Sequence, residues 1–136
     1  MTLGPTGERS LAATVYGLLD RGARLRPDIA AQLDGCVVVT FSDGGHADVR
    51  IDCHDGRIAV CDAALAGGGE PDLEIRASLH DFVVLLGAPL TRGFPKPTDR
   101  RGRAALARIA DGRVDFIGSI ALARRFMRVM SVAPET

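Results

Sequence analysis

A short segment of strict alternation, residues 47–53, most narrows what this chain can fold into. Ala47, Val49, Ile51 and Cys53 occupy every second position, and charged residues stand between them. Because successive side chains of a β-strand point to opposite faces, this pattern predicts a strand with one face buried and the other in water. The chain therefore needs a sheet whose inner face is covered by other elements.

Turn sequences on both sides of this strand predict a meander of three strands. A run rich in β-branched residues, at residues 36–41, predicts the first strand. Ser-Asp-Gly-Gly at residues 42–45 is typical of a hairpin turn and would connect it to the alternating strand. Asp55-Gly56 predicts a second tight turn into a third strand that ends near Asp62.

Two further alternating segments, residues 72–77 and 114–116, predict a fourth and a fifth strand. Helical spacing, N-cap residues and terminating glycines predict helices at residues 11–19 (ended by Gly22), 27–33, 79–86, 99–110 and 120–132. Each strand is apolar mainly on one face. This order predicts an α+β fold, with helices packed on one face of a five-stranded, mainly antiparallel sheet.

Length and composition fit one domain with a packed core. The chain has 136 residues, of which 46% are apolar and 25% charged. No apolar run approaches the roughly 20 residues that span a bilayer, and no signal peptide is evident, so we expect a cytoplasmic protein. The abundance of Ala, Arg and Gly indicates a GC-rich bacterial source.

Charge is balanced over the whole chain but not along it. There are 17 basic and 17 acidic residues, which argues against a surface tuned for nucleic acid. The basic residues concentrate in the last third. Within residues 92–113 the only aromatic side chain is Phe94. This segment therefore has few side chains that could stack on bases, and we expect no nucleic-acid partner.

No arrangement of reactive residues predicts a catalytic site, a metal or a cofactor. The chain has three cysteines, Cys36, Cys53 and Cys61. Their odd number and their spacing match neither a disulfide framework nor a zinc ribbon, so we expect reduced thiols. Cys53 and His54 are neighbours on a strand and point to opposite faces. A G-x-S-x-G elbow is absent, and the glycines at residues 67–69 precede no Lys-Ser or Lys-Thr pair.

Four segments, in order, resemble the sterol carrier protein 2 (SCP2) family of lipid-transfer domains. They are Asp55-Gly56, PDLEIRAS at residues 71–78, LLG at residues 85–87, and GRVDFIGS at residues 112–119, which runs into IALARRF. The resemblance implies a sheet and helices that enclose an apolar cavity for fatty acyl chains, sterols, isoprenoids or other lipids. It also implies that the last helix forms or gates that cavity.

On this basis we expect residues 1–9 to be a flexible tail, residues 10–132 an SCP2-like lipid-binding domain, and residues 133–136 a second tail. The predicted cavity-lining side chains come from the strands and helices that face the interior. They are Ile75, Phe82, Leu85, Leu86, Ile109, Phe116, Leu122, Phe126, Met127 and Met130. The alternative interpretation of the same residues is ordinary core.

The predicted last helix has two contrasting faces. Its apolar residues, Ile120 among them, occupy one broad arc, while Arg124, Arg125 and Arg128 cluster on the remainder. One interpretation is a helix that only covers the core and leaves its arginines solvated. The other is that the apolar arc lines a lipid cavity and the arginines contact anionic headgroups at a membrane surface or the phosphate of an acyl-CoA.

Two functions therefore remain open. The first is non-enzymatic binding and transfer or presentation of a lipid or fatty acyl ligand, with affinity from buried apolar area. The second is an accessory domain with a small or collapsed cavity. It would bind a partner enzyme of lipid, quinone or polyketide metabolism through the Pro- and Arg-rich crossover at residues 88–103. A small α+β isomerase is disfavoured because the predicted last element is a helix.

Overall fold

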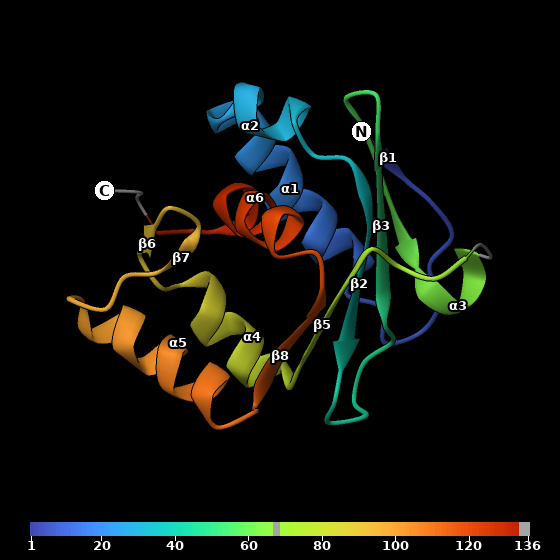
Figure 1. The fold of residues 1–136 in the computed structure, drawn as a ribbon. Helices are drawn as coiled ribbons and strands as arrows, with labels where there is room; N and C mark the ends of the chain where they lie inside the picture. Colours follow the sequence, from blue (N-terminus) through green and yellow to red (C-terminus); the bar gives the residue numbers. More distant parts are fainter. Residues whose placement is uncertain (67–68, 134–136) are drawn as a thin grey trace.

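The computed structural model describes residues 1–66 and 69–133 of the chain. A mixed sheet forms its centre, in the order β1-β4-β3-β2-β5-β8 (Figure 1). The strands are β1 (Thr2–Leu3), β2 (Gly35–Phe41), β3 (Val49–His54), β4 (Arg57–Asp62), β5 (Leu73–Ala77) and β8 (Val114–Gly118). Residues 67–68, two of the three consecutive glycines noted in the sequence, and 134–136, in the predicted C-terminal tail, lie outside the described residues.

Helices cover one face of this sheet. Figure 1 shows α1, α4 and α6 stacked against it, with α5 and a small hairpin, β6–β7, further out. The bounds are α1 (Ala12–Leu25), α2 (Pro27–Ala31), α3 (Ala63–Ala66), α4 (Leu79–Leu86), β6 (Leu90–Thr91), β7 (Phe94–Pro95), α5 (Arg100–Ala110) and α6 (Ile120–Met130). The core lies between the sheet and this helical layer, so the predicted helix-on-sheet arrangement holds.

The predicted meander is confirmed. β2 pairs antiparallel with β3, and β3 with β4. Asp55 and Gly56 both have positive φ, 51° and 75°, as a two-residue hairpin turn requires. Val49 and Ile51 are fully buried on the inner face. The alternation seen in the sequence therefore reports the side of the sheet that faces the helices.

Two features of the predicted sheet are wrong: it has six strands rather than five, and it is mixed. Thr2–Leu3, expected in a flexible tail, pairs parallel with β4. The tail is held further by the carboxylate of Asp62, which accepts hydrogen bonds from Gly7 N at 2.6 Å and from Ser10 Oγ. β5 runs parallel to β2 because the chain crosses from β4 past β3 and β2 before it enters the sheet again.

The first helix is longer than predicted. Gly22 was expected to end it, yet α1 continues to Leu25. Gly22 is buried at the point where the backbone of α6 passes, at Val129. This glycine therefore permits a close approach of two helices and does not end the first one. The last helix is shorter than predicted, ending at Met130 with Ser131 as its C-cap.

Predicted helix starts are largely confirmed by their caps. Pro27 occupies the first turn of α2. Ser78, Asp99 and Ser119 each accept a hydrogen bond from a backbone N–H of the helix that follows, at 3.1, 2.8 and 3.2 Å. Such caps satisfy N–H groups that a helix cannot pair internally. They fix where α4, α5 and α6 begin, and hence which side chains each helix turns inward.

Candidate functional site

Buried apolar side chains line the interior between the sheet and the helices. All ten predicted cavity-lining residues belong to one apolar cluster or pack against it. Phe126 is fully buried, and Met127 and Met130 are no more than 2% exposed. Ile109 and Phe116 are partly buried at its margin. The predicted residues therefore come together in one buried apolar cluster.

An apolar groove remains between α1 and α4. It has a volume of about 70 Å³, and the surface exposed inside it is wholly apolar. Its lining residues are Leu11, Thr14, Val15, Leu18, Phe41, Leu79, Phe82, Val83 and Leu86. Val83 is 57% exposed, which places it on the rim.

The two walls of the groove have the same spacing of apolar residues. Leu11, Val15 and Leu18 stand at i, i+4 and i+7 along the start of α1, and Leu79, Val83 and Leu86 repeat the spacing in α4. Residues so spaced share one face of a helix. Each helix therefore presents an apolar stripe to the other across the groove.

Aromatic rings form the floor. Phe41, the last residue of β2, lies edge-on to Phe82 of α4, with ring centroids 5.8 Å apart and an interplanar angle of 85°. The ring of His46 packs against Phe41 from the hairpin turn, with centroids 6.0 Å apart. Edge-to-face pairs of this kind hold rings in defined positions. The groove thus has a fixed aromatic base under two helical walls.

Sequence reasoning found two of the nine groove residues, Phe82 and Leu86. Four of the others, Leu11, Thr14, Val15 and Leu18, come from the start of the chain, which none of the four resembling segments covers. The apolar spacing of Leu11, Val15 and Leu18 was visible, but which element it would face was not. A periodic stripe indicates burial without indicating the element that lies opposite.

A buried carboxylate anchors the helix that carries one wall. Asp81 of α4, 4% exposed, accepts hydrogen bonds from Arg108 Nε at 2.9 Å and from Arg113 Nη2 at 2.8 Å. Burial on its own raises the pKa of the Asp81 carboxyl. Hydrogen bonds from Ser78 and Arg108 and the charge of Arg113 outweigh burial and hold that pKa below its ordinary value of 3.8. This ion cluster ties α4 to α5 and to the start of β8.

The three arginines predicted to contact headgroups differ in their surroundings. The guanidinium of Arg124 lies over the ring of Phe94, 4.8 Å from its centroid, a cation–π geometry. Arg125 is exposed. Arg128 is half-buried, and its backbone carbonyl accepts a hydrogen bond from Arg26 Nη1 at 2.7 Å. Ile120, placed in the apolar arc by the sequence, is instead 49% exposed.

The buried thiols are poorly suited to nucleophilic or metal chemistry. Burial, aided by the negative charge of Asp52, raises the pKa values of Cys36 and Cys53 to about 12, so thiolate is scarce near neutral pH. Across residues 1–66 and 69–133, no three His, Cys, Asp or Glu side chains gather as a metal site would need. Over the same ranges, no helix is long and apolar enough to cross a membrane.

Comparison with known proteins identifies the fold. The sequence matches no protein-family model and no curated protein. The structure does match solved ones. It superposes on the UbiJ-SCP2 ubiquinone synthesis protein with a TM-score of 0.59 and 15% identity, covering 90% of this chain and 86% of that one.

Two further solved structures are similar to this chain. The sterol carrier protein domain 2 of Helicoverpa armigera gives a TM-score of 0.58 at 17% identity, with 93% and 91% coverage. Sterol carrier protein 2 from Yarrowia lipolytica, in its apo form, gives 0.56 at 13% identity, with 91% and 92% coverage. The chain therefore has an SCP2-like α+β fold, as its sequence segments indicated.

Proposed function

We propose that this chain is a non-enzymatic lipid-binding domain that holds one apolar chain in the α1–α4 groove. The observation that carries the proposal is a wholly apolar groove, floored by Phe41 and Phe82, in an SCP2-like fold. Two of the similar structures are named sterol carrier proteins. Binding would draw on burial of apolar area and needs no covalent change.

The groove must widen to take a ligand, because about 70 Å³ is far below the roughly 300–1,000 Å³ of most ligand sites. Its walls belong to different packing units: α1 packs on α2, α6 and β4, whereas α4 packs on α5 and β5. Separation of α1 from α4 would therefore disturb few contacts within either unit. Rim side chains such as Val83 are already partly in water.

The shape of the groove favours a linear ligand. A fatty acyl or isoprenoid chain can enter between two helices one methylene at a time, whereas a rigid ring system requires the full width at once. Each buried methylene contributes about 0.8 kcal/mol, which is roughly a fourfold gain in affinity. Affinity should rise at this rate with chain length until the groove is filled.

Transfer between membranes is the second part of the proposal. Arg125 on the outer face of α6 is exposed, and Arg124 lies beside it over Phe94. With Arg128, these side chains would meet anionic headgroups while the apolar chain moves into the groove. We place this activity in the cytoplasm of a bacterium.

A second candidate function rests on the small volume of the groove. If α1 and α4 do not separate, the domain would serve as an accessory to a partner enzyme of lipid, quinone or polyketide metabolism. One similar structure is named a ubiquinone synthesis protein. The basic crossover at residues 88–103 would then supply the contact surface.

Fluorescent fatty-acid titration, with native mass spectrometry of the purified protein, tests the proposal. Val83→Asp places a carboxylate on the rim and should weaken binding at least tenfold, since a charge there must be desolvated. The matched control is Leu25→Asp, an equally exposed apolar residue of α1 outside the groove. Equal effects of the two variants would contradict the groove, and a protein that is always empty and refuses fatty acids would favour the accessory role.

A further inference from the structure

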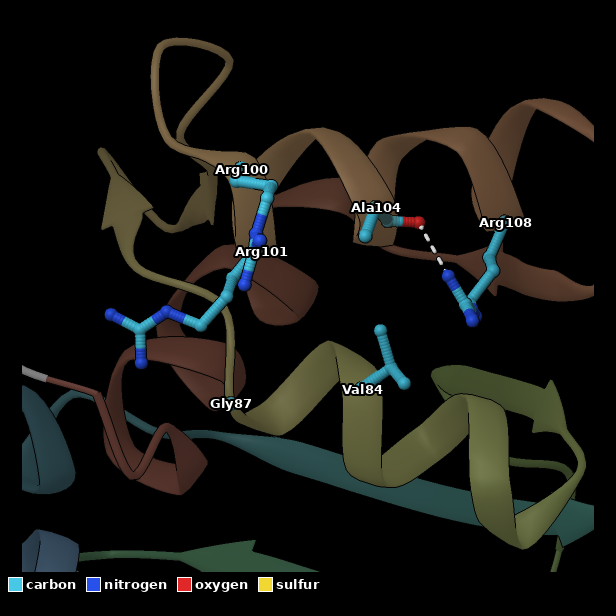
Figure 2. Close-up of a pocket in the computed structure, with 6 residues that line it drawn as sticks. All are labelled: Val84, Gly87, Arg100, Arg101, Ala104 and Arg108. Atoms are coloured by element: carbon cyan, nitrogen blue, oxygen red, sulfur yellow. Dashed lines mark hydrogen bonds between the residues drawn. The ribbon is translucent and has the colours of Figure 1, made fainter.

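A second hollow lies between α4 and α5, on another face of α4 from the groove. It has a volume of about 350 Å³, within the lower range of small-molecule sites. Figure 2 shows its lining, which is Val84, Gly87, Arg100, Arg101, Ala104 and Arg108. This α4–α5 cleft combines a small apolar floor with three guanidinium groups.

The apolar floor comes from one residue of each helix. Val84 is directed from α4 toward α5, and Ala104 lies opposite (Figure 2). Both are half-buried, and Gly87 leaves the end of the cleft without a side chain. A short hydrocarbon group between Val84 and Ala104 would therefore be covered on two sides.

One of the three guanidinium groups is held rigidly. Arg108 donates from Nε to Asp81 at 2.9 Å and from Nη1 to the carbonyl oxygen of Ala104 at 3.0 Å, the bond drawn in Figure 2. The same carboxylate also accepts hydrogen bonds from Arg113. Arg108 is thus a fixed wall of the cleft.

Two more guanidinium groups lie at the other end of the cleft. Across the described parts of the chain, no carboxylate lies within ion-pair distance of Arg100, whereas Arg101 Nε forms an ion pair with Asp99 at 3.7 Å in a largely exposed position. Residues 92–113 contain seven basic and two acidic residues, a net charge of +5. A neutral apolar ligand would make no electrostatic interaction with this positive charge. The cleft therefore favours an anionic ligand.

We propose that the α4–α5 cleft binds a small phosphomonoester that carries a short apolar group. Its phosphate would be held by the guanidinium group of Arg100 and by that of Arg101, which is directed away from Val84 and Ala104 in Figure 2 and would turn to join it. The planar donor forks of both groups match phosphate oxygens. Its apolar group would lie between Val84 and Ala104. A dianion suits two neighbouring arginines better than a single carboxylate does. This site uses none of the groove residues and stands independently of lipid binding there.

The test is an NMR titration with hexyl phosphate, a soluble probe, compared with hexanol and inorganic phosphate. Hexyl phosphate should bind more tightly than either and should shift the signals of Val84 and Ala104. Arg100→Gln with Arg101→Gln should weaken binding by about a hundredfold, at roughly tenfold for each lost charge-assisted contact. The matched control is Arg103→Gln, an exposed arginine of the same helix outside the cleft.

Two more variants distinguish binding in the cleft from binding to a diffuse basic surface or in the groove. Ala104→Leu fills the cleft without changing charge and should also abolish binding, whereas Val83→Asp in the groove should leave it unchanged. Equal losses for Arg103→Gln and the double variant would indicate a diffuse basic surface and overturn the proposal. So would inorganic phosphate binding as tightly as hexyl phosphate.

Vesicles containing phosphatidic acid distinguish a free phosphomonoester from a membrane headgroup. We expect Arg103→Gln and the double variant to weaken vesicle binding to the same small degree, since the cleft takes the free compound. A specific loss of vesicle binding in the double variant, with no binding of hexyl phosphate, would overturn the proposal in favour of a lipid surface. Circular dichroism and urea unfolding of each variant verify that the fold is retained.

Discussion

The Cβ atom that Gly22 lacks would lie 1.8 Å from the carbonyl oxygen of Val129. The backbones of α1 and α6 are therefore in direct contact at this point, and no side chain fits between them. This contact positions α1, one wall of the groove, against the layer of helices.

Gly22→Ala should destabilise the protein, because the new methyl group must push the two helices apart. We expect a loss of about 1–3 kcal/mol, the usual cost of overpacking a core, measured by urea unfolding. Gly17→Ala is the control on the same helix, since a Cβ there meets nothing within 4 Å. It should stabilise by about 0.5–1 kcal/mol, as alanine does in an exposed helix. Equal effects at the two positions would show that the helices are not in contact.

The buried ion cluster at Asp81 predicts a pH-dependent stability. The pKa of Asp81 is lower in the folded protein than its ordinary value of 3.8, so the ionised form stabilises the fold. That stability is present above pH 3.8 and is lost as the pH falls through the folded-state pKa.

Asp81→Asn should therefore cost about 1–3 kcal/mol at pH 7, because it weakens the contacts of two arginines. The difference from the wild type should shrink below about pH 4. Asp111→Asn, at an exposed position, should show neither effect. A difference that is constant from pH 7 to pH 3 would mean that Asp81 acts by packing alone.

The buried cysteines should be unreactive in the native protein. With pKa values of about 12 for Cys36 and Cys53, fewer than about one thiol in a thousand is ionised at pH 8. A thiol-disulfide reagent should label them slowly until urea unfolds the chain, after which all three cysteines react. Rapid labelling of Cys36 or Cys53 in the folded protein would contradict their burial.

The proposed headgroup contact predicts a charge effect on transfer. Arg124→Glu should slow lipid transfer from anionic vesicles several-fold and leave transfer from neutral vesicles unchanged, since only the former attract the arginine. Arg57→Glu, an exposed strand residue away from α6, controls for net charge. If Arg124→Glu slowed lipid transfer from anionic and neutral vesicles equally, the cause would be the lost cation–π contact with Phe94. A lost headgroup contact would then be contradicted.

Elements governed by local chemistry were predictable from the sequence. The meander follows from alternation and from the turn at Asp55-Gly56, and the starts of α4, α5 and α6 follow from their capping residues. The strand at Thr2–Leu3 was not predictable, because two residues carry no period. The loop that follows this strand is held by Asp62, which lies far along the chain.

The candidate site was predictable only in part. A helical wheel separates buried from exposed positions on α6, but Phe126 and Met130 satisfy it equally well as core or as cavity lining. Which of these they are depends on how closely facing layers pack, and that is a property of the whole fold. Substitutions such as Phe126→Asp are therefore uninformative about lipid binding, because a buried charge there would unfold the core.

The proposed function requires that an apolar chain enters between α1 and α4. The most direct measurement is a methyl and amide NMR titration of the protein with a medium-chain fatty acid. We expect the largest shifts at Leu18, Phe41, Phe82 and Val83, and we expect them to saturate with one ligand for each protein. Shifts centred on Phe126, Met127 and Met130 would place the ligand under α6 instead, and an unchanged spectrum at saturating fatty acid would contradict lipid binding altogether.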